Sequence, residues 1–282
     1  MKFKFSKMQG IGNDYVYVNC FEEKLDNVNE LAKLVSDRHF GIGSDGLVLI
    51  KPSDAADFRM DMYNSDGTQA QMCGNATRCV AKYVYERGLT DKKTITLETL
   101  AGIKTLELNA DRGLVDTVRV NMGPPELIPS KIPVRSGKER FIDEPVCVDG
   151  KEYRVTAVSM GNPHAIVLVD DPASVDIEKI GPMFENHPLF PERINTEFTK
   201  VISRSEIQMR VWERGAGETL ACGTGASATL VACCLLGLTD RRAVLRLLGG
   251  NLEIEWNEAD NNVYMTGKAR FVFDGEFDTD IL

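Results

Sequence analysis

An internal repeat with a constant spacing is the feature that most constrains how this chain folds. The segment FRMDMYNSDGTQAQMCGN at 58–75 aligns without a gap on IQMRVWERGAGETLACGT at 207–224, so that Cys73 falls on Cys222, 149 positions later. The same offset relates GLTD at 88–91 to GLTD at 237–240, and Gly12-Asn13 to Gly161-Asn162. Because three separated blocks share one offset, we interpret the chain as a duplicated unit whose two cysteines hold equivalent positions.

Each half combines strand patterns with helix patterns. Alternating or β-rich segments predict strands at 14–20, 46–50, 58–64, 94–100 and 117–122 in the first half, and at 165–170, 207–213, 243–248 and 252–256 in the second. One helix is expected after each repeated cysteine, ending at Gly88 and at Gly237. The second of these is apolar on all sides, which indicates burial within a sheet or barrel. Shorter outer helices are expected at 31–38 and 176–185.

These patterns predict an α+β fold of two pseudo-symmetric domains that arise from the duplication. Each domain is expected to be a curved β-sheet or barrel around a central helix, and the two are expected to face one another across a cleft. The turn-rich segment 121–133 is the expected crossover between them. Because 265–277 is similar to the start of the chain, we expect the tail to return, which gives domains of 1–122 with 267–282 and of 123–266.

Composition excludes several classes of function. A net charge of −9 at pH 7 argues against non-specific binding to nucleic acid or to an anionic membrane surface. No apolar run is long enough for a membrane span, and the N-terminal segment lacks the apolar stretch of a signal peptide, so we expect a cytoplasmic protein. In that compartment the seven cysteines are free thiols, and their spacing fits no common zinc pattern. Four of them are expected to be core residues: Cys20, Cys147, Cys233 and Cys234.

The two repeated cysteines each precede a glycine at a predicted helix start. Such a start presents unpaired N–H groups and the positive end of the helix dipole, which bind anions and lower the pKa of a thiol. The following glycine allows a carboxylate to approach the backbone closely. If both of these helix starts contribute to one site, one thiolate could remove a proton from a carbon while the other thiol delivers one to the opposite face of that carbon. The alternative is that both cysteines are small helix-start residues without a role.

The motifs GIGNDYVYV, HFGIGSDGLVLI, MYNSDG, MCGNATRC, VSMGNPHAIV, ERINTEF, WERGAGETLACGTGASA and EWN followed by VYMTG span nearly the whole chain. In this order they resemble diaminopimelate epimerase. The resemblance implies an epimerase that needs no cofactor and no metal, interconverts LL- and meso-2,6-diaminopimelate, serves lysine and peptidoglycan precursor synthesis, and acts as a homodimer. A small molecule is then the expected partner, rather than a nucleic acid or a membrane.

The resemblance also implies roles for individual residues. Cys73 and Cys222 match the two catalytic bases, and His164 and Glu213 match groups that help to set the protonation of the thiols. Gly74-Asn75 and Gly223-Thr224 match residues that hold the reacting carboxylate by their backbone N–H groups. The positions expected to bind the polar groups of the substrate are Asn13, Asn64, Asn162, Asn195, Glu213 and Arg214.

The same residues have structural readings, which the sequence leaves open. Gly-Asn pairs such as those at Asn13 and Asn162 usually form turns. His164 could be a structural histidine, and Glu213-Arg214 could be a surface charge pair of little energetic worth. The chain also departs from the family pattern at Gly46, where some members have glutamine, and at Ala76, where glycine is common. We expect the first to remove a side-chain contact and the second to tighten the helix start slightly.

Two other functions compete. Proline racemases and hydroxyproline epimerases resemble this family and use two similar cysteines, but they carry a histidine after the first Cys-Gly, where this chain has Asn75, and they lack the ERGAGET segment. A ring-shaped substrate would also leave Arg214 without a distal carboxylate. The other alternative is a dithiol redox switch without enzymatic activity.

Overall fold

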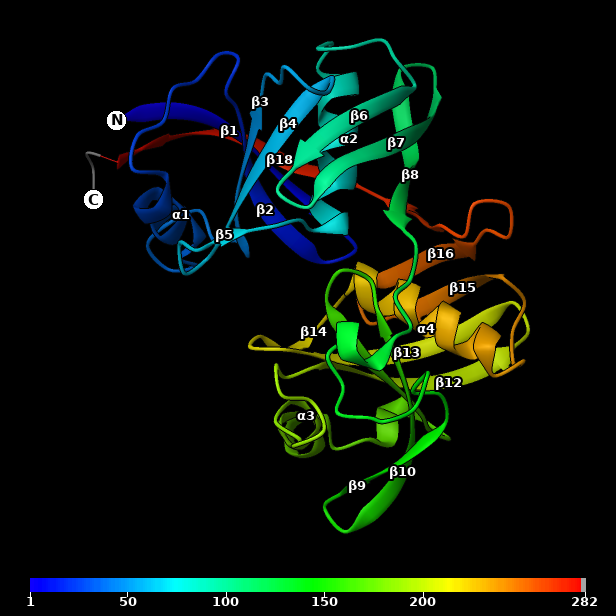
Figure 1. Ribbon diagram of the computed structural model, residues 1–282. Coiled ribbons are helices and arrows are strands. Elements are labelled where there is room, and N and C mark those ends of the chain that lie inside the picture. Colours follow the sequence, from blue (N-terminus) through cyan, green and yellow to red (C-terminus); the bar gives the residue numbers. More distant parts are fainter. Residues whose placement is uncertain (280–282) are drawn as a thin grey trace. The chain divides into compact units, whose positions relative to one another are not determined.

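The computed structural model describes residues 1–279 of the chain. These residues divide into two compact units: Met1–Val120 with the segment that begins at Gly267 (unit 1), and Asn121–Thr266 (unit 2). The division lies two residues from the expected boundary after residue 122. Figure 1 labels most of the elements, and each unit is described separately below.

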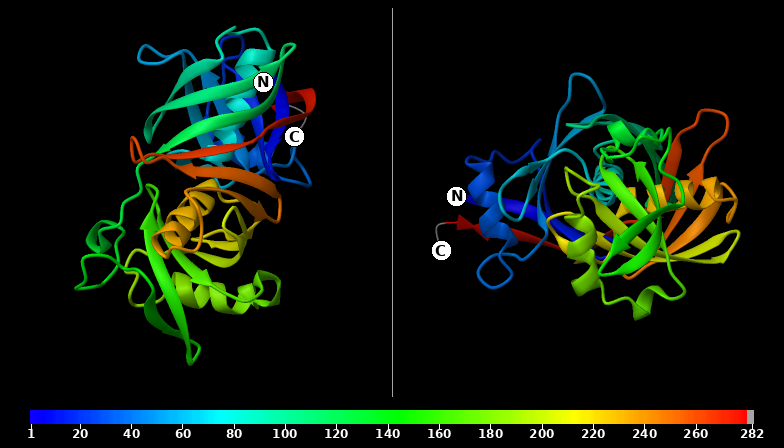
Figure 2. Two further views of the ribbon diagram at one scale, coloured as in Figure 1. Left: turned by 90° about the vertical axis from the view of Figure 1, so that its right-hand side faces the viewer. Right: turned by 60° about the horizontal axis from the view of Figure 1, so that its bottom comes forward.

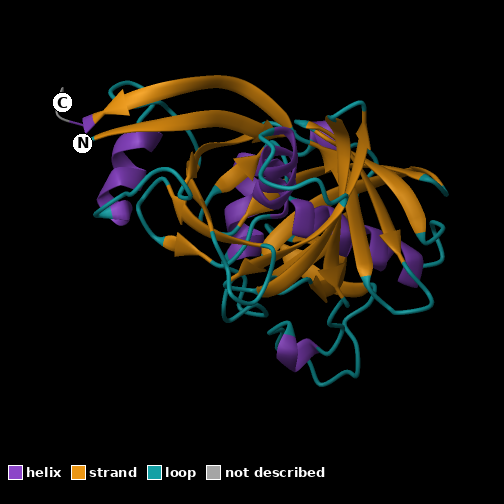
Figure 3. Ribbon diagram, turned by 90° about the horizontal axis from the view of Figure 1, so that it is seen from above, coloured by secondary structure: helices purple, strands orange, loops and turns teal. Residues whose placement is uncertain are grey.

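Unit 1 is a mixed sheet with two helices. The order of pairing along the sheet is β18-β1-β2-β3-β4-β6-β7-β8, with the short β5 paired to β4. Its strands are β1 (Lys2–Gly10), β2 (Asn13–Asn19), β3 (Gly46–Lys51), β4 (Phe58–Asn64), β5 (Gln69–Ala70), β6 (Thr94–Thr99), β7 (Gly102–Asp111), β8 (Leu114–Gly123) and β18 (Arg270–Asp278), and its helices are α1 (Val28–Ser36) and α2 (Gly74–Glu86). β18 returns from the far end of the sequence to pair antiparallel with β1, and the two run side by side in Figure 3.

Unit 2 repeats this arrangement strand for strand. Its pairing order is β9-β10-β11-β12-β13-β15-β16-β17, with the short β14 on β13. The strands are β9 (Glu144–Val148), β10 (Lys151–Ser159), β11 (Pro163–Leu168), β12 (Asn195–Ser203), β13 (Glu206–Glu213), β14 (Gly217–Thr219), β15 (Arg242–Leu247), β16 (Gly250–Trp256) and β17 (Val263–Lys268). The ends of β8 and β17 each extend past the boundary of their unit. The helices are α3 (Ile177–Glu185) and α4 (Gly223–Leu235), and the 3₁₀ turns are η1 (Pro129–Lys131) and η2 (Pro172–Ser174).

The equivalence of the units is exact at several elements. The residue numbers of β10, α3 and α4 exceed those of β1, α1 and α2 by 149 at both ends. Corresponding strand pairs also run in the same sense: β2–β3 and β11–β12 are parallel, and so are β4–β6 and β13–β15. The expected duplicated α+β fold is therefore confirmed.

The two helices that begin after the repeated cysteines are the central ones. α2 packs on β1, β2 and β7, and α4 packs on β10, β11, β12, β15 and β16. In both views of Figure 2 the gold helix α4 lies beside the orange strands of its sheet. Burial of α4 is nearly complete over its first ten residues except Thr224, as expected for a helix that is apolar on all sides. Gly88 and Gly237 follow the helices with φ of 72° and 71°, a conformation that glycine adopts without strain.

One expectation about the cysteines is wrong. Cys233 is a buried core residue and Cys20 and Cys234 are partly buried, but Cys147 is exposed. Cys147 lies on β9, where inward Val146 and Val148 alternate with outward residues, so the pleat of the strand turns the thiol to solvent. Among the described residues, no helix is long and apolar enough to cross a membrane.

Candidate functional site

Two cysteines occupy the same structural position in the two units. Cys73 is the N-cap residue of α2, with φ −135° and ψ 120°, and Cys222 is the N-cap of α4, with φ −119° and ψ 109°. In each case the cysteine carbonyl accepts the first helical hydrogen bond at 2.9 Å, from Thr77 N and Ala226 N respectively. Each cysteine therefore stands at a helix N-terminus, as predicted from the Cys-Gly pairs.

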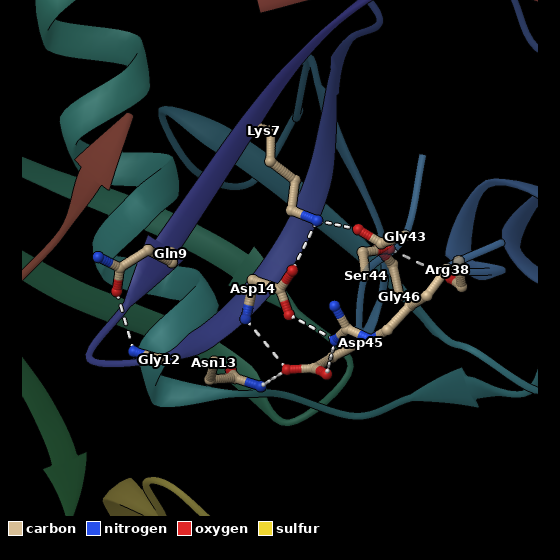
Figure 4. Close-up of polar contacts among 11 residues, drawn as sticks. Lys7, Gln9, Gly12, Asn13, Asp14, Arg38, Gly43, Ser44, Asp45 and Gly46 are labelled. Atoms are coloured by element: carbon tan, nitrogen blue, oxygen red, sulfur yellow. Dashed lines mark hydrogen bonds and ion pairs between the residues drawn. The ribbon is translucent and has the colours of Figure 1, made fainter. Parts of the chain in front are cut away.

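In unit 1, an asparagine side chain contacts the thiol. Cys73 Sγ donates to Asn13 Oδ1 over 3.3 Å, and Asn13 Nδ2 donates to Asp45 Oδ2 over 2.8 Å. Asp45 Oδ2 also accepts from the backbone N–H of Asp14 at 3.0 Å. Figure 4 shows Asn13 at the start of β2 with its amide nitrogen directed at Asp45. Asn13 is thus more than a turn residue, because its amide links the thiol to a carboxylate.

Two cationic side chains contact the Asp14 and Asp45 carboxylates. Arg38 Nη2 lies 3.0 Å from both Asp14 Oδ1 and Asp45 Oδ1, and Lys7 Nζ lies 2.6 Å from Asp14 Oδ2 and donates to the Gly43 carbonyl. Burial would raise the pKa of the Asp14 carboxyl, but the hydrogen bonds from Lys7 and Arg38 lower that pKa overall. Burial raises the pKa of Asp45, with the Asp14 charge adding to the effect. The Asp45 carboxylate is thus held by hydrogen bonds from the Asn13 side chain, the Asp14 backbone N–H and the Arg38 guanidinium, as Figure 4 shows.

A buried guanidinium supports the first turn of α2. Arg78 is fully buried; it donates from Nη1 to the Gly74 carbonyl at 3.1 Å and from Nη2 to Asn75 Oδ1 at 2.8 Å. Its Nε donates to the Lys268 carbonyl at 3.3 Å. The equivalent residue of unit 2 is Ser227, whose hydroxyl donates to the Gly223 carbonyl at 2.9 Å. Sequence analysis missed Arg78, although an arginine on the buried face of a helix was a usable signal.

In unit 2, the thiol is buried among carboxylates. Cys222 is 4% exposed, and its Sγ lies 3.5 Å from Thr224 Oγ1. Burial raises the pKa of the Cys222 thiol well above its ordinary value, and the charges of Glu213 and Glu197 raise it further. The expected lowering of the thiol pKa is therefore wrong for Cys222, because the hydrogen bonds from Thr224 and the Gly225 N–H do not outweigh burial and two carboxylates. Glu213 in turn accepts a short hydrogen bond from Thr219 Oγ1.

His164 belongs to a chain of three polar side chains in the same unit. Its Nδ1 lies 2.7 Å from Glu197 Oε1, and its Nε2 lies 3.0 Å from Asn162 Oδ1. The side chains of His164 and Glu197 are both fully buried. Burial raises the pKa of Glu197, an effect that the proximity of His164 reduces. Sequence analysis assigned no role to Glu197, because the segment NTEFTKVIS has no apolar alternation that would mark a buried glutamate.

The remaining candidates make hydrogen bonds within their own units. Asn195 uses both ends of its amide: Nδ2 donates to the Pro163 carbonyl and Oδ1 accepts from the Arg214 N–H, each at 2.8 Å. The Arg214 guanidinium donates to the Glu192 carbonyl at 2.8 Å, and Asn64 Nδ2 donates to Thr68 Oγ1 at 3.0 Å. Asn195 thereby positions the backbone before the loop that leads to Cys222, while Glu213 and Arg214 are only partly buried.

The two departures from the family pattern have local explanations. A Cβ at Gly46 would overlap the Tyr63 carbonyl oxygen and lie 2.8 Å from the Tyr15 ring, so this backbone leaves no room for a glutamine. Ala76 is fully buried in the first turn of α2. Its equivalent Gly225 is more constrained, because a Cβ there would overlap Glu197 Oε1 and lie 3.3 Å from Cys222 Sγ. Among residues 1–279, no group of three or more His, Cys, Asp or Glu side chains could hold a metal ion.

Comparisons with known proteins agree on one family. The family model for diaminopimelate epimerase matches residues 5–128 and 156–272. The chain is 63% identical over 275 residues to a diaminopimelate epimerase from Acetivibrio thermocellus, covering 98% of both chains. It is 58% identical to a diaminopimelate epimerase from Methanococcus maripaludis, covering 98% of this chain and 99% of the relative.

Solved structures with little sequence identity share the fold. The chain is similar to a probable proline racemase from Agrobacterium radiobacter, with a TM-score of 0.72 at 16% identity, over 99% of this chain and 93% of that one. It is also similar to a hydroxyproline epimerase from Agrobacterium vitis, with a TM-score of 0.68 at 16% identity, over 98% and 91% of the two chains. At this level of identity the likeness concerns the fold alone.

Proposed function

This chain belongs to the diaminopimelate epimerase family, and we propose that it interconverts LL- and meso-2,6-diaminopimelate in the synthesis of lysine and peptidoglycan precursors. The observation that carries the proposal is the matched pair of cysteines, each the N-cap of the central helix of its unit. Neither a proline racemase nor a redox switch is favoured. The relatives above are 58–63% identical and named diaminopimelate epimerase, and Asn75 replaces the histidine expected of the racemases.

The reaction is proposed to use two bases and no cofactor. Cys73 and Cys222 are proposed to act on opposite faces of the α-carbon of the bound substrate. The thiolate of one removes the α-proton, the electron pair of the broken C–H bond moves toward the carboxylate, and the thiol of the other gives its proton to the opposite face. After turnover, the first sulfur carries the proton and the second is the thiolate, so the reverse reaction uses the same groups with exchanged roles.

The first turns of α2 and α4 are proposed to hold the reacting carboxylate. The backbone N–H groups at Gly74-Asn75 and Gly223-Thr224 belong to helix N-termini, where negative charge is stabilised. That stabilisation increases as the α-proton leaves and charge accumulates on the carboxylate oxygens, which lowers the barrier to carbanion formation. Arg78 supports the turn of α2 by binding the Gly74 carbonyl and the Asn75 side chain.

The other polar residues are proposed to bind the remaining groups of the substrate and to control protonation. Arg214 suits the distal carboxylate and Glu213 an ammonium group, with Asn13, Asn64, Asn162 and Asn195 as further binding positions. His164 and Glu213 are proposed to adjust the protonation of the thiols. We further propose that the protein is a cytoplasmic homodimer and works without pyridoxal phosphate.

The test is epimerisation of LL-diaminopimelate by purified, reduced protein without added cofactor. Cys73→Ala and Cys222→Ala should each reduce formation of the meso isomer to a negligible rate. Cys79→Ala is the matched control, because Cys79 is a buried thiol of α2 and the equivalent position of unit 2 is Ala228. Proline serves as a control substrate. Turnover of proline but not diaminopimelate, or full activity in either Cys→Ala variant of the proposed bases, would refute the proposal.

A further inference from the structure

Unit 2 contains a buried acidic side chain that the proposed reaction does not use. Glu197 on β12 is fully buried, and its Oε1 lies 2.7 Å from Nδ1 of the equally buried His164 on β11. Its second oxygen, Oε2, has no hydrogen-bond partner among the described residues. A buried carboxylate is costly unless a proton or a cation accompanies it. His164 supplies the hydrogen-bond contact to Oε1 of this carboxyl group.

The internal repeat shows that the pair is not a requirement of the fold. The positions of unit 1 that correspond to His164, Glu197 and Gly225 are Tyr15, Val48 and Ala76, each 149 residues earlier. Tyr15 and Val48 are also buried, and the strands pair in the same sense. The sheet of unit 1 therefore forms with Tyr15 and Val48 at the positions that His164 and Glu197 occupy in unit 2. The His–Glu pair, and the glycine that makes room for the carboxyl group, are found beside Cys222 and not at the equivalent positions beside Cys73.

The contacts determine where the hydrogens of the His164 ring lie. Glu197 Oε1 is an acceptor when ionised, so Nδ1 must carry a hydrogen and donate it. Nε2 faces the Asn162 amide at 3.0 Å. An amide can accept from a protonated Nε2 through its oxygen or, after turning over, donate to an unprotonated Nε2 through its nitrogen. Asn162 thus accommodates both protonation states of Nε2, while an ionised Glu197 permits only one state of Nδ1.

We propose that Glu197 is a positioning residue that keeps a hydrogen on Nδ1 of His164 and so makes Nε2 the nitrogen through which His164 exchanges protons. The inference rests on the proposed epimerase function, in which His164 adjusts the protonation of the thiols. A carboxylate that accepts a hydrogen bond from one ring nitrogen of a histidine fixes the tautomer and the orientation of the ring. The other ionisable groups that influence Glu197 and its surroundings are Glu213 on β13 and the Cys222 thiol.

The tautomer of His164 can be read directly in the resting protein. The chain has three histidines, so the ring ¹⁵N resonances of a histidine-labelled sample can be assigned with His39→Gln and His187→Gln. We expect His164 of the wild type to hold its hydrogen on Nδ1 whenever the ring is neutral. Glu197→Val, which copies Val48, and Glu197→Gln, whose amide accepts or donates with equal ease, should both give a mixture of tautomers. A wild-type His164 with its hydrogen on Nε2, or variants with an unchanged tautomer, would overturn the proposal.

Kinetics supply the second measurement. Both Glu197 variants should lower kcat about ten- to a hundred-fold, the usual range for loss of a group that orients a functional histidine, with little change in KM. Lys200→Gln, an exposed change on the same strand, is the control and should leave kcat unchanged. Glu197→Gln keeps the shape of the side chain, so it remains informative if Glu197→Val does not fold. Unchanged kcat in a folded variant would overturn the proposal. Inactivity of the wild type toward diaminopimelate would refute the epimerase function. The ¹⁵N resonances of the His164 ring would still show whether Glu197 determines its tautomer.

Discussion

Asp45 accepts a hydrogen bond from Asn13 Nδ2 at 2.8 Å, and this contact decides which end of the Asn13 amide faces Cys73. With the nitrogen engaged, the oxygen lies 3.3 Å from Cys73 Sγ and accepts the thiol hydrogen. A carbonyl oxygen stabilises the thiol and not the thiolate, because a thiolate has no hydrogen to donate. Asp45 therefore orients the Asn13 amide so that its oxygen, and not its nitrogen, faces the Cys73 thiol.

Asp45→Asn is expected to release this constraint. Its amide can donate to Asn13, so the Asn13 nitrogen becomes free to turn toward the sulfur and stabilise the thiolate. Alkylation of Cys73 by iodoacetamide at neutral pH should then accelerate by up to about ten-fold. The rate is measured by mass spectrometry of the peptide that contains Cys73, with the exposed change Glu22→Gln as control. A slower or equal rate would contradict the account of Asn13.

Gly225→Ala is expected to destabilise the protein by about 1–3 kcal/mol, as overpacking of a core typically does. The added methyl group would overlap Glu197 Oε1. The double variant Glu197→Val with Gly225→Ala reproduces Val48 and Ala76 of unit 1, and we expect it to regain most of the lost free energy of unfolding but little of the activity. Urea unfolding of the four proteins checks this coupling. Additive effects of the two substitutions would show that the positions do not interact.

Arg78→Ser, which copies Ser227 of unit 2, is expected to lower the free energy of unfolding by roughly 2–5 kcal/mol. It removes the donors to the Gly74 carbonyl and to Asn75 Oδ1 and leaves a cavity in the core. Since the first turn of α2 is proposed to hold the carboxylate, KM should rise as well. Thermal unfolding and steady-state kinetics measure the two effects, and a stable variant with an unchanged KM would contradict the role of Arg78.

Buried thiols should make the protein less stable at alkaline pH. Burial raises the pKa of Cys79 from 9.0 to about 11. Below pH 9 the thiol is protonated in both states, whereas between pH 9 and 11 only the unfolded chain releases the proton. Unfolding therefore becomes easier as pH rises through this window, by up to about 1.4 kcal/mol per pH unit for such a thiol. Cys79→Ala should show a shallower fall of the urea midpoint from pH 9 to 11 under reducing conditions, and an equal slope would contradict the shift.

The duplicated fold could be predicted because the repeat runs without gaps and keeps one offset through both central helices. Strands with strong patterns, such as β3 and β4, were identified, but β7 was not, since its only buried residues are Leu106 and Leu108 and its alternation is weak. The corners at Cys73 and Cys222 were identifiable because a cysteine, a glycine and a helix start are adjacent in sequence.

The residues that surround Cys73 and Cys222 are brought there by tertiary contacts and could not be predicted. Asp45 reaches Asn13 from 32 residues away, and Glu197 reaches His164 from 33 residues away across a parallel strand pair. Neither spacing has a sequence signature. The same limit explains the wrong expectation for Cys222: its helix start was visible, but the burial and the two carboxylates that raise its pKa were not.

The proposed two-base reaction is tested most directly by deuterium incorporation at early times. LL-diaminopimelate is incubated in heavy water with reduced wild-type protein, and the first few per cent of reaction are analysed by NMR and mass spectrometry. Because the proton is taken by one sulfur and a deuteron is given by the other, the meso product should carry one deuterium at the inverted carbon while the remaining LL substrate stays unlabelled. Meso product that retains the original hydrogen would mean that one base serves both faces, and would contradict the paired roles of Cys73 and Cys222.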